Sequence, residues 1–209
     1  MANPEHVAIL RQGVEVWNQW RKDNLDIRPD LHMADFTGAD LTGANFYCVE
    51  WGRGKLSHAH LRECVFAASN LFAVDFGWSN LTGANLSKAD LSLAHMNDCA
   101  LSGVNVYGTV FYLTSLRNAD LSQSALKHAI FDQTTFDETD FNQTSCAYNV
   151  FSNVDLSTAK GLETVHHAAP STIGIDTLFK SKGNIPDVFL RGCGVPEKLI
   201  ATLPMLLEE

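Results

Sequence analysis

Residues 84–93 read Ala84-Asn85-Leu86-Ser87-Lys88-Ala89-Asp90-Leu91-Ser92-Leu93, which are two consecutive copies of a five-residue unit. Each copy places a small residue first, Asp or Asn second and a large apolar residue third. The apolar position recurs at every fifth residue from Leu31 to Leu156, 26 times without a change of register. This unit therefore organises most of the 209-residue chain.

A period of five residues excludes both regular secondary structures. An α-helix rotates by about 100° per residue, so a stripe with five-residue spacing drifts around the helix. A straight strand sends alternate side chains to opposite faces, so an odd spacing places successive stripe residues on different faces. The backbone must therefore turn a corner every five residues to return each apolar side chain to the interior.

The position two residues before each apolar residue is small in nearly every unit, and the exceptions are Pro29 and Asn149. Positions two apart share a face in an extended segment, so both point inward and the residue between them points outward. Acidic residues at this outward position could suggest acid catalysis, but we expect them to bond to turns instead. The outward Asp and Asn residues include Asp35, Asp40, Asn45, Asn70, Asp75, Asn80, Asn85, Asp90, Asn105, Asp120, Asp140 and Asp155.

Units such as Ala39-Asp40-Leu41-Thr42-Gly43 and Ala84–Lys88 resemble the pentapeptide-repeat family. The resemblance covers residues 29–161 and implies an all-β solenoid, a right-handed quadrilateral parallel β-helix with four repeats per coil. The 26 repeats then make about 6.5 coils of 20 residues, stacked at roughly 4.8 Å.

The chain divides into three predicted parts: an N-terminal helical cap at 1–28, the pentapeptide-repeat β-helix at 29–161, and a helical C-terminal segment or linker at 162–209. Asn3 and Pro4 predict the start of a helix, whose face of Leu10, Val14 and Trp17 should cover the first coil. The alternative is that this helix binds a partner.

The repeat is predicted to end near residue 161, and short helices should follow. Ser171 is predicted to begin one helix, and Gly183 to stop it. Residues 186–190 could form a short turn, and Pro196 should begin a last helix that Pro204 kinks or shortens.

Two stretches of this segment, Ile173–Leu178 and Phe189–Pro196, resemble the linker of bacterial pentapeptide-repeat proteins that continue into a TIR domain. The beginning of the chain, Leu10–Gly13 with Trp17-Asn18 and Trp20-Arg21, is similar to the start of the same architecture. The resemblance implies the non-catalytic front half of a larger defence or signalling protein. It assigns no TIR chemistry to any residue of this chain, which stops before such a domain would begin.

Charge and hydropathy restrict the partners of the chain. The net charge is −9, and residues 29–161 hold fourteen acidic and seven basic residues without a basic cluster. Phosphate binding requires clustered cations, so we expect no direct nucleic-acid binding. No apolar run has the length of a membrane span and no signal-like start is present, so we expect no membrane association. Five cysteines without paired spacing indicate a reduced, cytoplasmic protein.

The sequence shows no catalytic motif. His58 and His60 lie at one corner and His166 and His167 lie beyond the repeat, but neither pair has an evident third ligand. We therefore predict no enzyme activity, no cofactor and no metal site.

One side of the predicted coil breaks the polar pattern of the surface. Residues 20 apart should share a side, and the side that contains Leu91 and Phe131 carries apolar residues at outward positions. Patches of this kind usually mark contacts. We expect the C-terminal helices to cover the patch, or alternatively a second copy in a homodimer. This candidate interaction patch, the apolar strip, comprises Phe72, Leu93, Val110, Tyr112, Leu113, Ile130 and Val150.

Two functions fit these observations. The first is a structural or protein-interaction scaffold, the recognition or oligomerisation half of a TIR-type protein. The second is a DNA mimic that inhibits DNA gyrase, as quinolone-resistance pentapeptide proteins do. Such mimicry needs a uniformly acidic surface, whereas Lys55, Arg62, Lys88, Arg117 and Lys127 interrupt the acidic residues here.

Overall fold

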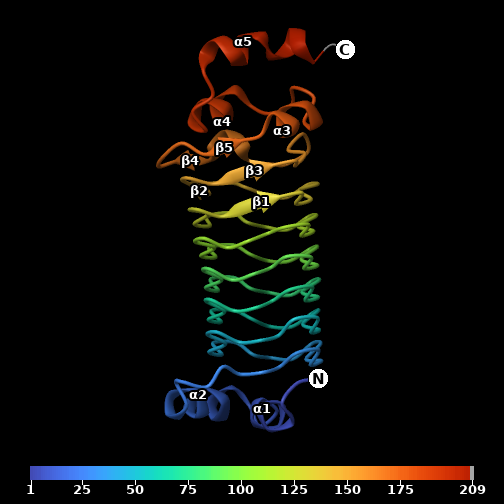
Figure 1. Ribbon diagram of the computed structural model, residues 1–209, viewed down its shortest axis with the longest axis vertical. Helices are drawn as coiled ribbons and strands as arrows, with labels where there is room; N and C mark the ends of the chain where they lie inside the picture. The colour runs from blue at the N-terminus through green and yellow to red at the C-terminus, as the bar shows by residue number, and fades with distance from the viewer. Residues whose placement is uncertain (208–209) are drawn as a thin grey trace.

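The computed structural model describes residues 1–207, which form a rod of stacked coils with helices at both ends (Figure 1). Parallel β-bridges join residues that are 20 apart, from Asp30 with Glu50 to Asp140 with Lys160. The backbone turns a corner every five residues, so each coil has four sides. The sides pair mostly through single bridges rather than extended strands. The right-handed sense of the coil stays an expectation from the resemblance.

Main-chain hydrogen bonds hold each coil to the next. The Leu31 N–H donates to the Glu50 carbonyl at 2.7 Å, and the Glu50 N–H donates to the Pro29 carbonyl at 2.8 Å. The same pattern repeats along the rod. Because each coil bonds to the coils above and below, the two ends must find other partners for their backbone groups.

The interior contains the stripe that the sequence predicts. All 26 stripe residues from Leu31 to Leu156 are buried. Aromatic members stack between coils, with ring centroids 5.0 Å apart for Phe46 and Phe66 and 4.9 Å apart for Phe111 and Phe131. Most of the small inward residues that carry hydroxyls bond to carbonyls of the coil below, as the Ser69 hydroxyl does to the Phe46 oxygen at 2.7 Å.

The outward Asp and Asn residues bond to turns, as expected. In each case a side-chain oxygen accepts a hydrogen bond from the backbone N–H two residues later. This bond lowers the pKa of the Asp35 and Asp40 carboxyls below their ordinary values. The bond occurs at Asp30, Asp35, Asp40, Asn45, Asn70, Asp75, Asn80, Asn85, Asp90, Asn105, Asp120, Asp140 and Asp155.

Each corner contains a residue in the left-handed region of backbone space. The series begins at Met33, with φ of 61°, and ends at Asn153, with φ of 54°. Most members are not glycine, although this conformation costs a non-glycine residue about 1–2 kcal/mol. The bonds between coils offset this cost, since the same corner residue donates its N–H to the next coil, as Met33 does to Gly52 at 3.0 Å.

One oversized stripe residue depends on a glycine. Trp51 is fully buried, and Gly54 occupies the small inward position three residues later. A Cβ atom at Gly54 would lie 2.2 Å from Trp51 Cδ1 and 2.5 Å from its Nε1. The indole therefore fits because residue 54 has no side chain.

We predict that Gly54→Ala lowers the free energy of unfolding by about 2 kcal/mol, the typical cost of overpacking a core. In a Trp51→Leu background the same change should cost close to nothing, because the clash is removed. Urea unfolding of the four proteins of this double-mutant cycle measures the coupling. An equal cost in both backgrounds would show that the indole is not what requires the glycine.

Two helices, rather than the single predicted helix, cover the first coil. Helix α1 (Pro4–Leu10) begins at the predicted cap, where the Asn3 side chain accepts from the Glu5 N–H. Gly13 then adopts φ of 114°, which ends the helical path before α2 (Val14–Asp23). The predicted apolar face of Leu10, Val14 and Trp17 is therefore divided between two elements, although it still packs on the core.

The side chains of these helices bond to the open backbone of the first coil. Trp17 Nε1 donates to the Asn45 carbonyl at 2.9 Å, and the buried Arg21 donates to the Tyr47 carbonyl at 3.0 Å. Asn18 accepts from the Asn45 N–H at 2.8 Å. These contacts support the interpretation of the N-terminal segment as a cap, because they satisfy groups that would otherwise face an open edge.

The predicted end of the coil near residue 161 is wrong, because parallel pairing continues beyond it. Strand β2 (Ser145–Cys146) pairs with β4 (His166–His167). Strand β3 (Val150–Ser152) lies between β1 (Ile130–Asp132) and β5 (Thr172–Ile173). The spacing grows from 20 to 21 and then 22 residues, with the 3₁₀ turn η1 (Leu162–Thr164) inserted between. Insertions of one residue hide this last coil from a strict five-residue pattern.

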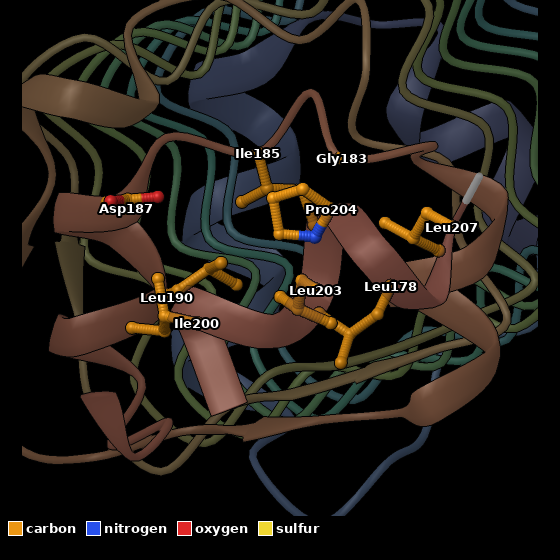
Figure 2. Close-up of a pocket in the computed structure, with 9 residues that line it drawn as sticks. All are labelled: Leu178, Gly183, Ile185, Asp187, Leu190, Ile200, Leu203, Pro204 and Leu207. Carbon is orange, nitrogen blue, oxygen red and sulfur yellow. The ribbon is translucent and has the colours of Figure 1, made fainter. Parts of the chain in front are cut away.

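Three helices complete the C-terminal end: α3 (Ile175–Lys180), α4 (Asp187–Gly192) and α5 (Glu197–Leu206). Ser171 does not begin a helix, since β5 follows it, and residues 187–192 form a helix rather than a turn. Pro204 lies inside α5, which continues to Leu206. Helix α5 lies beyond α3 and α4 (Figure 1), and side chains from all three helices line a mostly apolar cavity (Figure 2). The volume of this cavity is about 50 Å³. No helix within residues 1–207 is long and apolar enough to cross a membrane.

Candidate interaction surface

Three residues of the apolar strip form a column on one side of the rod. Val110 bridges Ile130, and Ile130 pairs with Val150, so their outward side chains stack over three coils. Tyr112 and Leu113 extend the column around the next corner, and both are exposed. Leu93 and Ile130 are also exposed, while Phe72, Val110 and Val150 are half-buried.

The expectation that the C-terminal helices cover the strip is wrong. Helices α3, α4 and α5 lie beyond the last coil, on the end of the rod rather than along its side (Figure 1). Their buried residues, among them Leu178, Phe189 and Ile200, pack against the end of the core. The buried apolar residues of the C-terminal helices therefore close the interior, and the strip faces solvent in the single chain.

An aromatic ladder that the five-residue pattern does not predict borders the strip. Tyr107, His128 and Tyr148 occupy the corner before it, with ring centroids 5.1 and 5.0 Å apart in successive coils. Tyr107 and Tyr148 are exposed. The 20-residue spacing relates His128 to Tyr148, but Tyr107 lies 21 residues before His128 and so falls outside that column.

Charges are distributed unequally around the rod. The side that precedes the strip lacks Asp and Glu and carries Lys88 and Lys127 (residues 44–48, 64–68, 84–88, 104–108, 124–128 and 144–148). The side that follows the strip holds acidic residues that are partly paired: Lys55 lies 3.6 Å from Asp35, and Arg117 lies 2.7 Å from Asp137. The apolar strip therefore separates a cationic side from an acidic one.

The other candidate groups do not converge on a chemical site. His58 stacks on the exposed Trp78 with ring centroids 5.4 Å apart, and no cluster of three metal ligands occurs within residues 1–207. All five cysteines are free. Burial raises the pKa of Cys64 and Cys146 to about 12 and that of Cys99 to about 11, so these thiols stay protonated at neutral pH. The apolar cavity is far smaller than the roughly 300–1,000 Å³ of typical ligand sites.

The sequence profile of pentapeptide repeats matches the chain in eight copies, over residues 28–49, 55–87, 75–112 and 114–157. These ranges include more than half of the chain. No curated protein sequence matches it.

Several solved structures are similar to this chain. A pentapeptide repeat protein from the thylakoid lumen of Arabidopsis thaliana is 27% identical with a TM-score of 0.46, over 47% of this chain and 68% of the other. QnrB1, a plasmid-mediated fluoroquinolone resistance protein, is 15% identical with a TM-score of 0.38, over 68% and 78%. Rfr23 from the cyanobacterium Cyanothece 51142 is 21% identical with a TM-score of 0.25, over 62% and 92%.

Proposed function

Because the chain belongs to the pentapeptide-repeat family, we propose that it is a non-catalytic interaction module whose contact surface is the apolar strip. Proteins of this family are generally structural or interaction proteins. The observation that carries the proposal is the exposure of Leu93, Tyr112, Leu113 and Ile130 on one side of a rod whose other outward positions are mostly polar. An exposed apolar patch of this kind marks a binding surface.

The partner that fits this surface is a second copy of the chain. A two-fold axis parallel to the rod places Ile130 of one copy against Ile130 of the other. Each of the two corners that border the strip then faces the opposite corner of the second copy. Lys127 lies at one corner that borders the strip, and Asp132 lies at the other corner, five residues later in the same coil. In the dimer, Lys127 of each copy therefore faces Asp132 of the other copy. Opposite charges at the rim of an apolar centre fix the register of such a contact.

A parallel homodimer also suits the TIR-type architecture that the C-terminal segment resembles. Both C-terminal ends lie at the same end of such a dimer, so two following domains would be brought together. The residues that resemble the linker form a packed cap, since the Phe189 ring lies 5.7 Å from that of Phe151 and is 1% exposed. This cap would hold following domains at a fixed distance from the recognition surface.

We predict that Ile130→Asp converts a dimer into a monomer. The substitution places two carboxylates at the centre of an apolar contact, where they would be desolvated without a partner. Sedimentation equilibrium of the purified proteins at micromolar concentrations measures the masses.

The matched control is Ala100→Asp, which introduces the same residue at an outward position on the opposite side of the rod. This variant should keep the dimer, because the strip is unchanged. A wild-type protein that is monomeric at every concentration tested would refute self-association, and a monomeric Ala100→Asp variant would refute the assignment to this side.

The acidic side of the rod supports a second function, mimicry of DNA and inhibition of DNA gyrase. Its acidic residues are Asp35, Asp75, Asp98, Asp137, Glu138 and Asp155. The ion pairs of Lys55 and Arg117 interrupt this surface, which is the reason that we rank mimicry below the interaction module.

We expect the purified protein to leave the supercoiling activity of DNA gyrase unchanged at micromolar concentrations. An agarose-gel assay measures the supercoiling activity. A Lys55→Glu/Arg117→Glu variant serves as the comparison, because these substitutions remove the two basic residues from the acidic side. Inhibition by the wild-type protein in the micromolar range would favour mimicry over the proposed module.

A further inference from the structure

His167 takes the stripe position of the last coil and is half-buried there. Cys146 of β2 belongs to the inward stripe and is in register with His167 of β4. The corresponding residues of the lower coils on this side are apolar: Phe46, Phe66, Leu86, Val106 and Leu126. His167 is therefore the one histidine among these stripe positions.

Both nitrogens of the His167 imidazole are buried without a hydrogen-bond partner. The hydroxyl of Thr144, on the coil directly below, also has none. Within residues 1–207 the only other such side-chain atom is Nε of Arg21, at the opposite end of the rod. Buried polar groups are almost always paired, so the two unpartnered imidazole nitrogens are unfavourable in the closed structure.

Helix α4 packs directly on the imidazole. The Phe189 ring meets the His167 ring edge-to-face, with centroids 5.1 Å apart. A Cβ atom at Gly192 would lie 2.1 Å from His167 Cδ2, so the backbone of α4 approaches the ring as closely as a glycine allows. His167 thus lies between the last coil and the helix that begins to close it.

Within residues 1–207, no carboxylate is among the groups that act on the charge of His167. On α4, Asp187 and Arg191 pair with each other at 3.3 Å, and on η1 Glu163 is exposed. The thiols of Cys146 on β2 and Cys193 after α4 are protonated, since burial raises the pKa of each to about 12. Burial, followed by the neighbouring His166, lowers the pKa of His167.

We propose that His167 is a pH-sensitive latch, which holds the C-terminal cap (residues 162–207) on the end of the rod only while its imidazole is neutral. When the cap opens, the ring reaches water and its pKa rises toward about 6.5. The latch is therefore fully closed above about pH 6.5, and its stability is lost as the pH falls from there toward the lower pKa of the closed form. Opening exposes the unpaired edges of β2 and β3, which are normally covered by β4 and β5.

Hydrogen exchange followed by mass spectrometry tests the latch, after correction for the intrinsic effect of pH. The reporters are the N–H groups of Ala168 and Gly174, which donate to Cys146 and Phe151 of the coil below. The equilibrium constant for opening at these two N–H groups should rise about tenfold for each pH unit below about pH 6.5. The same constant for the His60 N–H, inside the coil, should rise less.

Two substitutions at position 167 and one at position 166 separate the latch from general effects of acid. His167→Leu restores the apolar stripe, and His167→Gln keeps a polar side chain that does not titrate, so both should remove the extra opening. His166→Leu changes the exposed neighbour and should retain it. The proposal is overturned if the variants at 167 keep the wild-type response, or if His166→Leu abolishes it.

A direct titration completes the test without any substitution. The carbon-bound ring protons of His167 in the folded wild-type protein, followed by NMR, should report a pKa below 6.5. A value of 6.5 or higher in the closed form would refute the latch.

Discussion

Every fifth residue of the coil holds a left-handed backbone conformation, and the inward direction of the stripe from Leu31 to Leu156 depends on it. A chain without these corners would send its apolar residues to alternating faces. The conformation is unfavourable for most of the residues that adopt it, so it persists only because neighbouring coils bond to the corner N–H groups. Local strain and coil-to-coil hydrogen bonding are thus one cooperative system, as expected for a solenoid in which each repeat contacts only its neighbours.

The same dependence explains why both ends are closed by side chains that carry donors and acceptors. At the first coil, Trp17, Asn18 and Arg21 bond to backbone groups that have no coil below them. At the last coil, the Thr177 hydroxyl donates to the Phe151 carbonyl at 3.1 Å, and the Ser181 hydroxyl accepts from the Leu156 N–H at 3.0 Å. The C-terminal helices lie on the end of the rod, so they leave the strip on its side uncovered (Figure 1).

The repeat predicts the interior and the outward side chains because one rule applies at every unit. That rule fails where the spacing changes: Ser145 pairs with His166 at 21 residues and Val150 with Thr172 at 22, so the last coil has no five-residue signal. The break at Gly13 depends on how the helices meet the first coil, which residue types alone do not define. The strip follows from counting by 20, but its exposure depends on where the C-terminal helices pack. The sequence shows His167 only as one of two adjacent histidines. Its place on the inward stripe could not be predicted, because that place depends on the shifted register of the last coil.

The central claim is that position within a 20-residue count decides which side of the rod a residue occupies. Pyrene attached to Val110→Cys and Ile130→Cys in a Cys48→Ser background tests it, since these outward positions are bridge partners in adjacent coils. The labelled protein is mixed with a large excess of unlabelled protein, so that excimers between two copies do not contribute. Excimer fluorescence should be strong, because stacked strands lie about 4.8 Å apart. Inserting one unit, Ala-Asn-Leu-Ser-Lys, between Leu113 and Thr114 should leave the protein folded but move residue 130 to the next side and remove the excimer. Excimer emission that survives the insertion would contradict the account.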